Sequence, residues 1–304
     1  MISMLDRPLK ARAFSGRSRR RRVVNNVATV LVTLSMVIAV TPLLLVLFAV
    51  IVKGFRAIAS TVWWTHSQAG MTAFVAGGGA YHAIVGTLLQ GLVCAVISIP
   101  IAIMVAIYLV EYGGGGPLGR LATFMVDILS GVPSIVAALF IYALWVATLG
   151  LPRSEFAVSL ALVLLMIPVI VRATEEMLRI VPIDLREASY ALGIPKWKTI
   201  ARIVIPAGLS GIITGIMLAV ARVLGETAPL LILVGYSQSM NYNIFSGFMG
   251  SLPGMMYDQT LAGAGIGPVP TDRLWGAALT LILVIAVINI GARVIAKIYA
   301  PRKT

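Results

Sequence analysis

The sequence predicts an all-α membrane protein with six transmembrane helices, and three observations lead to this fold class. First, 59% of the 304 residues are hydrophobic and only 12% are charged, which gives a mean hydropathy of +0.98. Water-soluble domains do not have this composition. Second, the apolar residues form six long runs. Third, Lys and Arg gather in alternate connecting segments, the bias that orients membrane helices. We therefore expect both termini to be cytoplasmic.

The first two spans follow a basic N-terminal segment. Residues 1–22 contain eight Lys or Arg, which predicts a cytoplasmic N-terminus. The apolar run at 27–50 is longer than the core of a signal peptide, so we expect an uncleaved first span. An outer loop with the pair Trp63-Trp64 then leads to the second span at 83–110. Paired tryptophans are typical of the membrane interface.

The third span is expected at 121–149 and the fourth at 156–179, with a tight outer turn between them. The third contains the sequence Gly131-Val132-Pro133-Ser134, and the fourth contains Pro168. A proline in a span frees a backbone carbonyl and bends the helix, which is tolerated where protein or water satisfies the freed group. We therefore expect a bend in the third span at Pro133.

The fifth span is expected at 208–235 and the sixth at 274–295, separated by the longest outer loop. Together the six spans define a transmembrane domain at 23–300. The outer segments contain only four of the Lys and Arg residues: Lys53, Arg56, Arg153 and Arg273. The net charge of +13 is thus explained by topology, and we expect contact with the lipid bilayer and no nucleic-acid partner.

Several kinds of chemistry are not expected. Cys94 is the one cysteine and lies in a predicted span, so no intrachain disulfide is possible. His66 and His82 belong to no ligand cluster, and we expect no metal site. The glycines at 113–116 are not a phosphate-binding ATP loop, because no Lys-Ser or Lys-Thr follows them. We therefore expect no enzyme activity and no cofactor in this chain.

Charged residues inside the spans are the main functional candidates, because each costs about 2.5–3.5 kcal/mol at the bilayer centre on insertion scales. Arg222 is predicted near the middle of the fifth span, with Glu226 on the same helix face four residues later. An arginine fork binds tetrahedral oxyanions well, and Thr227 could add a hydroxyl donor. The alternative is a buried Arg222–Glu226 ion pair that fixes the helix register.

Arg172 is the second candidate for a substrate path. It follows Pro168 in the fourth span, with carboxylates at Glu175 and Glu176. Because it is expected nearer the inner face, the alternative is that its side chain extends to the cytoplasmic interface. Asp127 is either a charge at the membrane edge or the partner of an arginine.

A long polar segment at 183–206 connects the fourth and fifth spans on the inner side. Its first part favours a short helix with an early carboxylate, ended by a glycine with positive φ at Gly193. The segment resembles the EAA motif of bacterial ABC-importer permeases, on residues that have the spacing of that family: Glu187, Ala188, Ser189, Gly193, Ile203 and Pro206. In those permeases it is the coupling helix that sits in a cleft of the ATPase. The family usually has alanine where Ser189 stands.

A second resemblance concerns Ala221 to Pro229, which is similar to the Arg-x-x-Gly-Glu-Thr signature of PstA-type permeases in phosphate importers. Residues 131–136 resemble that family as well, although Ala138 stands where a glycine is expected. The resemblance implies the type I ABC-importer permease fold in the bacterial plasma membrane. It also implies that Arg222 and Glu226 serve inorganic phosphate.

The same resemblance implies a set of partners. These are a second, PstC-type permease subunit, a dimeric ATPase subunit that binds ATP and Mg²⁺, and an extracytoplasmic phosphate-binding protein. Three alternatives stay open: a permease for another oxyanion such as sulfate, molybdate or phosphonate; an ion-coupled secondary anion transporter; and a membrane scaffold or sensor in which Arg222 and Glu226 are structural.

Overall fold

A computed structural model describes residues 19–299 of the chain, so the predicted basic segment at 1–22 lies mostly outside the described residues. The chain divides into two compact units at residues 49 and 50. The first unit contains most of the long helix α1 (Arg19–Ile58), whose apolar side chains are exposed almost throughout. The last turns of α1 belong to the second unit, where Gly54 packs on the backbone of Trp275.

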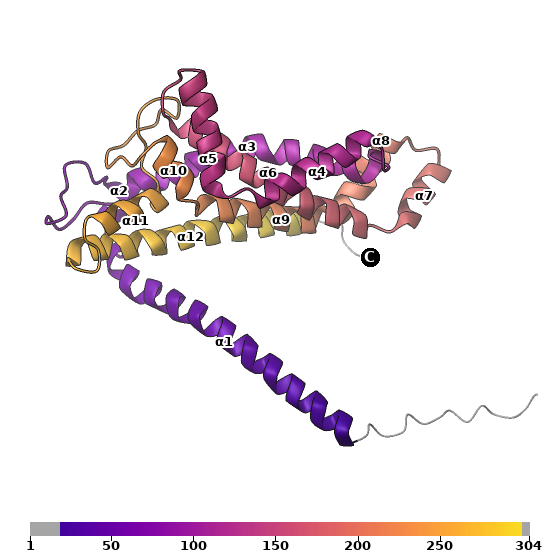
Figure 1. Ribbon diagram of the computed structural model, residues 1–304, viewed down its shortest axis with the longest axis horizontal. Coiled ribbons are helices and arrows are strands. Elements are labelled where there is room, and N and C mark those ends of the chain that lie inside the picture. The colour runs from indigo at the N-terminus through magenta and orange to yellow at the C-terminus, as the bar shows by residue number, and fades with distance from the viewer. Residues whose placement is uncertain (1–18, 300–304) are drawn as a thin grey trace, which may run out of the picture. The chain divides into compact units, whose positions relative to one another are not determined.

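The second unit is a helix bundle built around α6 (Glu155–Ile180). In this bundle (Figure 1), α6 packs on α3 (Tyr81–Ile107) and on α9 (Ile205–Leu224), and α12 (Pro268–Tyr299) packs on the α9 helix. In the apolar part of α6, 61% of the residues are buried, more than in any of the other candidate spans of the described chain. The middle of α6 therefore forms the core, with the fully buried side chains of Leu162, Met166 and Ile170.

Small residues set the close packing of α9 on α6. A Cβ added at Gly215 would collide with Ala173 of α6, and one added at Gly211 would collide with the side chain of Met177. Glycines four residues apart lie on the same helix face and allow two backbones to approach closely, as membrane helices commonly do. The crossing of α6 and α9 is therefore fixed by this glycine face.

Six spans are present in the described residues if one bent pair counts as a single span. Five helices are long and apolar enough to cross a membrane by themselves. The pair consists of α4 (Pro117–Gly131) and α5 (Ser134–Ile141) with its π-helical extension η2 (Tyr142–Thr148), bent by 108°. The predicted bend in the third span is thus present, and it is sharper than a proline kink because Val132 and Pro133 leave the helix altogether.

The fifth span differs from the predicted 208–235. The helical stretch begins at Lys196 with α8 (Lys196–Thr199) and the π-helical turn η3 (Ile200–Val204), and it continues into α9. It ends at Leu224, and a non-helical link at 225–227 leads to the short α10 (Ala228–Leu233). The link has a local cause, because Gly225 is a poor helix former and Pro229 cannot donate a hydrogen bond to the carbonyl four residues earlier.

The two ends of the second unit differ in character (Figure 1). One end contains α7 (Ile183–Ala191), α8 and the π-helical turn η1 (Tyr108–Tyr112), which extends α3. We refer to it as the α7 end; the sequence predicts that it faces the cytoplasm. The other end, the α11 end, contains α2 (Thr61–Thr65), α10, α11 (Leu252–Leu261) and the long loops. The sixth span begins earlier than predicted, at Pro268.

Candidate functional site

Arg222 lies at the interruption of the fifth span. The structure places it in the last turn of α9, and not in the middle of a continuous helix as the sequence predicted. Its side chain is 59% exposed, and its Nε lies 3.9 Å from Oε1 of Glu226. The expected pairing of Arg222 with Glu226 is therefore present, but the distance is too long for a hydrogen bond. In the described residues, the guanidinium donors of Arg222 therefore have no hydrogen-bond partner.

The backbone around Arg222 is irregular in a way that suits a cavity. The link at 225–227 leads into α10, and α10 packs on α5, the helix that follows the bend at 131–133. Apart from the adjoining backbone of its own helix, nothing lies within 4 Å of the place where a Cβ of Gly131 would stand, so there is open space at that bend. Non-helical backbone at membrane depth is tolerated where protein buries it or where it lines a water-filled cavity.

Thr227 is the third member of the predicted substrate site. It directly precedes α10 and is half-buried, and its side chain does not cap the helix. In the described part of the chain, its hydroxyl has no hydrogen-bond partner. The link therefore offers a hydroxyl five residues after the exposed guanidinium of Arg222.

Arg172 lies in a chain of alternating charges that connects α4 to α6. Its Nη2 donates to Asp127 Oδ1, and its Nη1 donates to Glu175 Oε2 at 2.8 Å. The other oxygen of Glu175 accepts from Arg179 at 2.6 Å. Two carboxylates thus neutralise Arg172 in this conformation, whereas Arg222 has one distant partner. A substrate role for Arg172 stays a prediction.

The polar segment at 183–206 contains the expected short helix. α7 ends at Ala191, two residues before Gly193, which has a φ of +74°. The amide of Gly193 donates to the carbonyl of Tyr190 at 2.9 Å, and the amide of Ile194 donates to the carbonyl of Ser189 at 3.2 Å. This pair of bonds is the glycine-ended helix stop called the Schellman motif. The predicted role of Gly193 as the helix stop is confirmed.

The other motif residues fall into exposed and buried groups. Glu187 and Ala188 are exposed on α7. Ser189 is buried, and its hydroxyl shares a hydrogen bond of 2.7 Å with the hydroxyl of Thr199 in α8. The serine that departs from the usual alanine therefore attaches α7 to α8. Ile203 is half-buried in η3, and Pro206 is in the first turn of α9.

The α7 end also exposes large apolar side chains. Leu192 is 79% exposed, Trp197 is 66% exposed and Ile183 is 65% exposed. These three residues belong to the polar segment between two spans, so lipid tails do not explain their exposure. Together with Glu187 and Ala188 they form a surface that is suited to a partner protein.

Sequence reasoning missed the residues that hold this segment in place. Arg186 of α7 donates from Nε and Nη2 to Oε1 of Glu111, at 3.1 and 2.9 Å. The two residues are 75 positions apart, so no local pattern could pair them. Only one signal was available from the sequence, the position of each residue. Glu111 is a carboxylate at the end of an apolar run, and Arg186 is an arginine inside the segment at 183–206.

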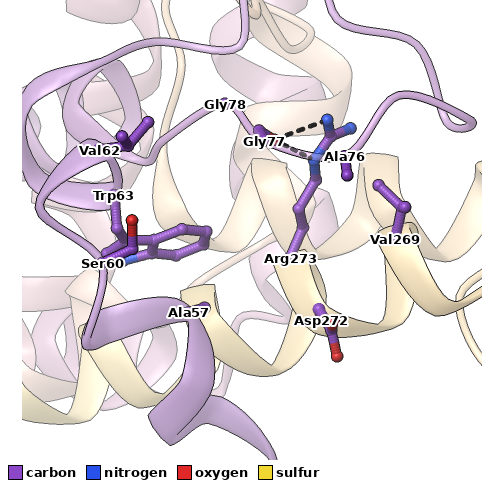
Figure 2. Close-up of a pocket in the computed structure, with 10 residues that line it drawn as sticks. All are labelled: Ala57, Ser60, Val62, Trp63, Ala76, Gly77, Gly78, Val269, Asp272 and Arg273. Carbon is purple, nitrogen blue, oxygen red and sulfur yellow. Dashed lines mark hydrogen bonds between the residues drawn. The ribbon is translucent and has the colours of Figure 1, made fainter.

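A cavity of about 240 Å³ at the α11 end is not an anion site, although it contains an arginine. Figure 2 shows Arg273 reaching Gly77 in the loop that follows α2. The guanidinium donates to the carbonyls of Thr72, Val75 and Gly77 at 2.8–3.1 Å. Because these carbonyls use its donors, Arg273 orders the loop at 66–80 and has few donors left for a ligand.

A buried hydrogen-bonded chain joins three segments at the same end. The Tyr236 hydroxyl donates to Gln68 Oε1 at 2.9 Å and lies 2.8 Å from Nε2 of His82. Burial is the main cause that raises the pKa of Tyr236, and the charge of Asp258 raises it further. The hydroxyl therefore stays protonated and connects the loop at 66–80, the start of α3 and the segment after α10.

Comparison with known proteins decides the family. A family model described as "Binding-protein-dependent transport system inner membrane component" matches residues 98–304. The chain belongs to this family. It is therefore a multi-pass inner-membrane transport component. The matched range includes the bent pair α4 and α5, the segment at 183–206 and Arg222.

Individual relatives of this transport component are similar over nearly their whole length. It is 55% identical over 289 residues to the phosphate transport system permease protein PstA of Mycobacterium leprae, covering 95% of this chain and 94% of the relative. It is 54% identical over 294 residues to PstA 1 of Mycobacterium tuberculosis strain H37Rv, covering 97% and 94%. It is 38% identical over 277 residues to PstA of Yersinia pestis, covering 90% of each.

Solved structures confirm the fold of an ABC-importer permease. One is a bacterial ABC transporter involved in the import of the acidic polysaccharide alginate, with a TM-score of 0.59, 15% identity and coverage of 91% of this chain and 98% of that chain. The other is an inward-facing MetNI methionine ABC transporter, with a TM-score of 0.57, 17% identity and coverage of 73% and 95%. These identities support the fold alone.

Proposed function

We propose that this chain is the permease subunit of an ATP-driven importer of inorganic phosphate. The observation that carries the proposal is the exposed guanidinium of Arg222 at a helix interruption, loosely paired with Glu226. The names of the relatives support phosphate as the substrate, because they are phosphate transport system permeases. The resemblance of residues 221–229 to the signature of such permeases points in the same direction.

Arg222 provides the charge that phosphate needs on its way through a low-dielectric environment. A guanidinium binds two oxygens of a tetrahedral oxyanion through parallel N–H donors and keeps its charge at any physiological pH. Glu226 balances that charge from 3.9 Å without a hydrogen bond. An entering phosphate therefore binds the guanidinium without breaking a strong contact. The hydroxyl of Thr227 adds a further hydrogen-bond donor to the phosphate.

The exposure of Arg222 implies that another polypeptide covers it. An arginine that faces lipid at membrane depth is costly, and such residues face a bundle interior or a water-filled cavity. The side chain is 59% exposed when this chain stands alone. We therefore place the translocation cavity between this chain and a second, PstC-type permease subunit, with Arg222 on the wall that this chain contributes.

The exposed surface of α7 is the proposed docking site of the ATPase. Glu187 and Ala188 are accessible there, and Leu192 adds apolar area next to Gly193. In this proposal a dimeric ATPase subunit binds and hydrolyses ATP with Mg²⁺ and moves the segment at 183–206. A phosphate-binding protein delivers the anion at the α11 end, which completes a binding-protein-dependent importer.

Substrate and energy source are tested on the complete complex in proteoliposomes. We expect uptake of labelled phosphate that requires the binding protein outside and ATP inside the vesicles. A hundredfold excess of sulfate or molybdate should leave phosphate uptake unchanged. Strong competition by one of these ions would favour an importer for that oxyanion. Uptake without ATP and without the binding protein would instead indicate an ion-coupled secondary transporter.

A further inference from the structure

Glu111 lies at the point where α3 meets the segment at 183–206. It belongs to η1, the π-helical turn at the end of α3, and its side chain is only 6% exposed. Arg186 of α7 is also largely buried, with 13% of its side chain exposed. Two donors of the guanidinium converge on Oε1 of Glu111. A buried charged pair of this kind is held in one geometry much more firmly than a surface ion pair.

The same guanidinium also binds the end of α6. Nη2 of Arg186 donates to the carbonyl of Leu178 at 2.9 Å, and Nη1 donates to the carbonyl of Val181 at 2.6 Å. Leu178 is in the last turn of α6, and Val181 directly follows the helix. Carbonyls at a helix end have no hydrogen-bond partner within the helix. One side chain of α7 therefore holds the ends of α3 and α6 together.

Lys196, at the start of α8, also contacts Glu111 of η1. Nζ of Lys196 donates to the backbone carbonyl of Glu111 and lies 4.5 Å from the centre of the Tyr112 ring. The segment at 183–206 is thus attached to η1 twice, through Arg186 on one side of Gly193 and through Lys196 on the other. A displacement of α7 and α8 together must displace η1.

α3 continues from this attachment to the neighbourhood of the proposed substrate site. Gly91 lies twenty residues before Glu111 on the same helical stretch, about 30 Å away at the rise of an α-helix. A Cβ at Gly91 would stand 2.6 Å from Cδ2 of Leu224, two residues after Arg222 on α9. A rigid shift of α3 therefore reaches the last turn of α9.

We propose that Glu111 is the positioning residue through which movement of α7 and α8 passes into α3 and on to the Arg222 site. The inference rests on the proposed function, since the movement it transmits is that driven by the ATPase. Glu111 itself contacts neither phosphate nor ATP. Its carboxylate keeps Arg186 in place, and its carbonyl holds Lys196.

The test compares Glu111→Gln with Glu176→Gln in the complete complex in proteoliposomes. Glutamine keeps the size of Glu111 and one acceptor oxygen but loses the charge that holds Arg186. Glu176 is a suitable control because it is an exposed carboxylate of α6 with no hydrogen bond or ion pair in the described residues. ATP hydrolysis and phosphate uptake are measured on the same vesicles, and their ratio gives the phosphate moved per ATP.

We expect Glu111→Gln to keep ATP hydrolysis within about threefold of wild type while phosphate per ATP falls at least tenfold, and Glu176→Gln to resemble wild type. Arg186→Lys, which keeps one charged donor, should fall between them. An unchanged ratio in both Glu111→Gln and Arg186→Lys would overturn the inference, as would less assembled complex with a normal ratio. A wild-type complex that moves no phosphate would instead contradict the proposed function.

Discussion

The hydrogen bond between Ser189 and Thr199 gives a sharp prediction about the segment at 183–206. Both hydroxyls are buried and lie 2.7 Å apart. Thr199→Val leaves the Ser189 hydroxyl buried without a partner, which costs about 1–3 kcal/mol. Ser189→Ala costs less, about 0.5–1.5 kcal/mol, because the Thr199 hydroxyl keeps its contact with the carbonyl of Pro195 at 3.4 Å. The double variant should cost less than the sum of the two.

Hydrogen exchange of the amides between residues 183 and 204 measures this local stability in the assembled complex. Each 1.4 kcal/mol raises the exchange of protected amides about tenfold, so Thr199→Val should increase exchange by roughly 5- to 100-fold. The double-mutant cycle should give a coupling of about 1 kcal/mol. Additive effects of the two substitutions, or a larger effect of Ser189→Ala than of Thr199→Val, would refute the reasoning.

Three further predictions concern single contacts. Gly193→Val should destabilise the stop of α7 by about 1–3 kcal/mol, because valine is strained at a φ of +74°; unchanged amide exchange in α7 would contradict this. Gly215→Val should force α9 away from α6 and lower the melting temperature of the complex, and an unchanged melting temperature would show that the crossing is not tight. Tyr236→Phe removes the hydroxyl between Gln68 and His82, so proteolysis in the loop at 66–80 should become faster; equal rates would argue against that link.

Local sequence signals were sufficient for much of the fold. The six apolar runs predicted the spans, and the sequence at 131–134 predicted a bend in the third. The end of α7 at Gly193 was predictable because a helix stop with positive φ is a local event that favours glycine. Membrane helices are the favourable case for such reasoning, since each must satisfy its own backbone within the bilayer.

Contacts between distant residues could not be predicted in the same way. Apolar residues resume at Ala228, directly after the three residues 225–227, so hydropathy averaged over the span placed Arg222 in a continuous helix. The interruption was signalled only by Gly225 and Pro229, which membrane helices often tolerate. The links from Arg172 to Asp127 and from Arg186 to Glu111 join residues 45 and 75 positions apart. They depend on how the helices pack, which periodicity does not specify.

The central claim is that Arg222 binds phosphate on its path, and uptake by Arg222→Gln tests it most directly. The matched control is Arg153→Gln, which removes an exposed arginine outside the site. Hydrogen bonds to charged groups are worth about 1.5–3 kcal/mol each, so we expect labelled phosphate uptake to fall at least 10- to 100-fold in Arg222→Gln. The amount of assembled complex should not change, and Arg153→Gln should transport normally. Wild-type uptake by Arg222→Gln at equal complex levels would contradict the account.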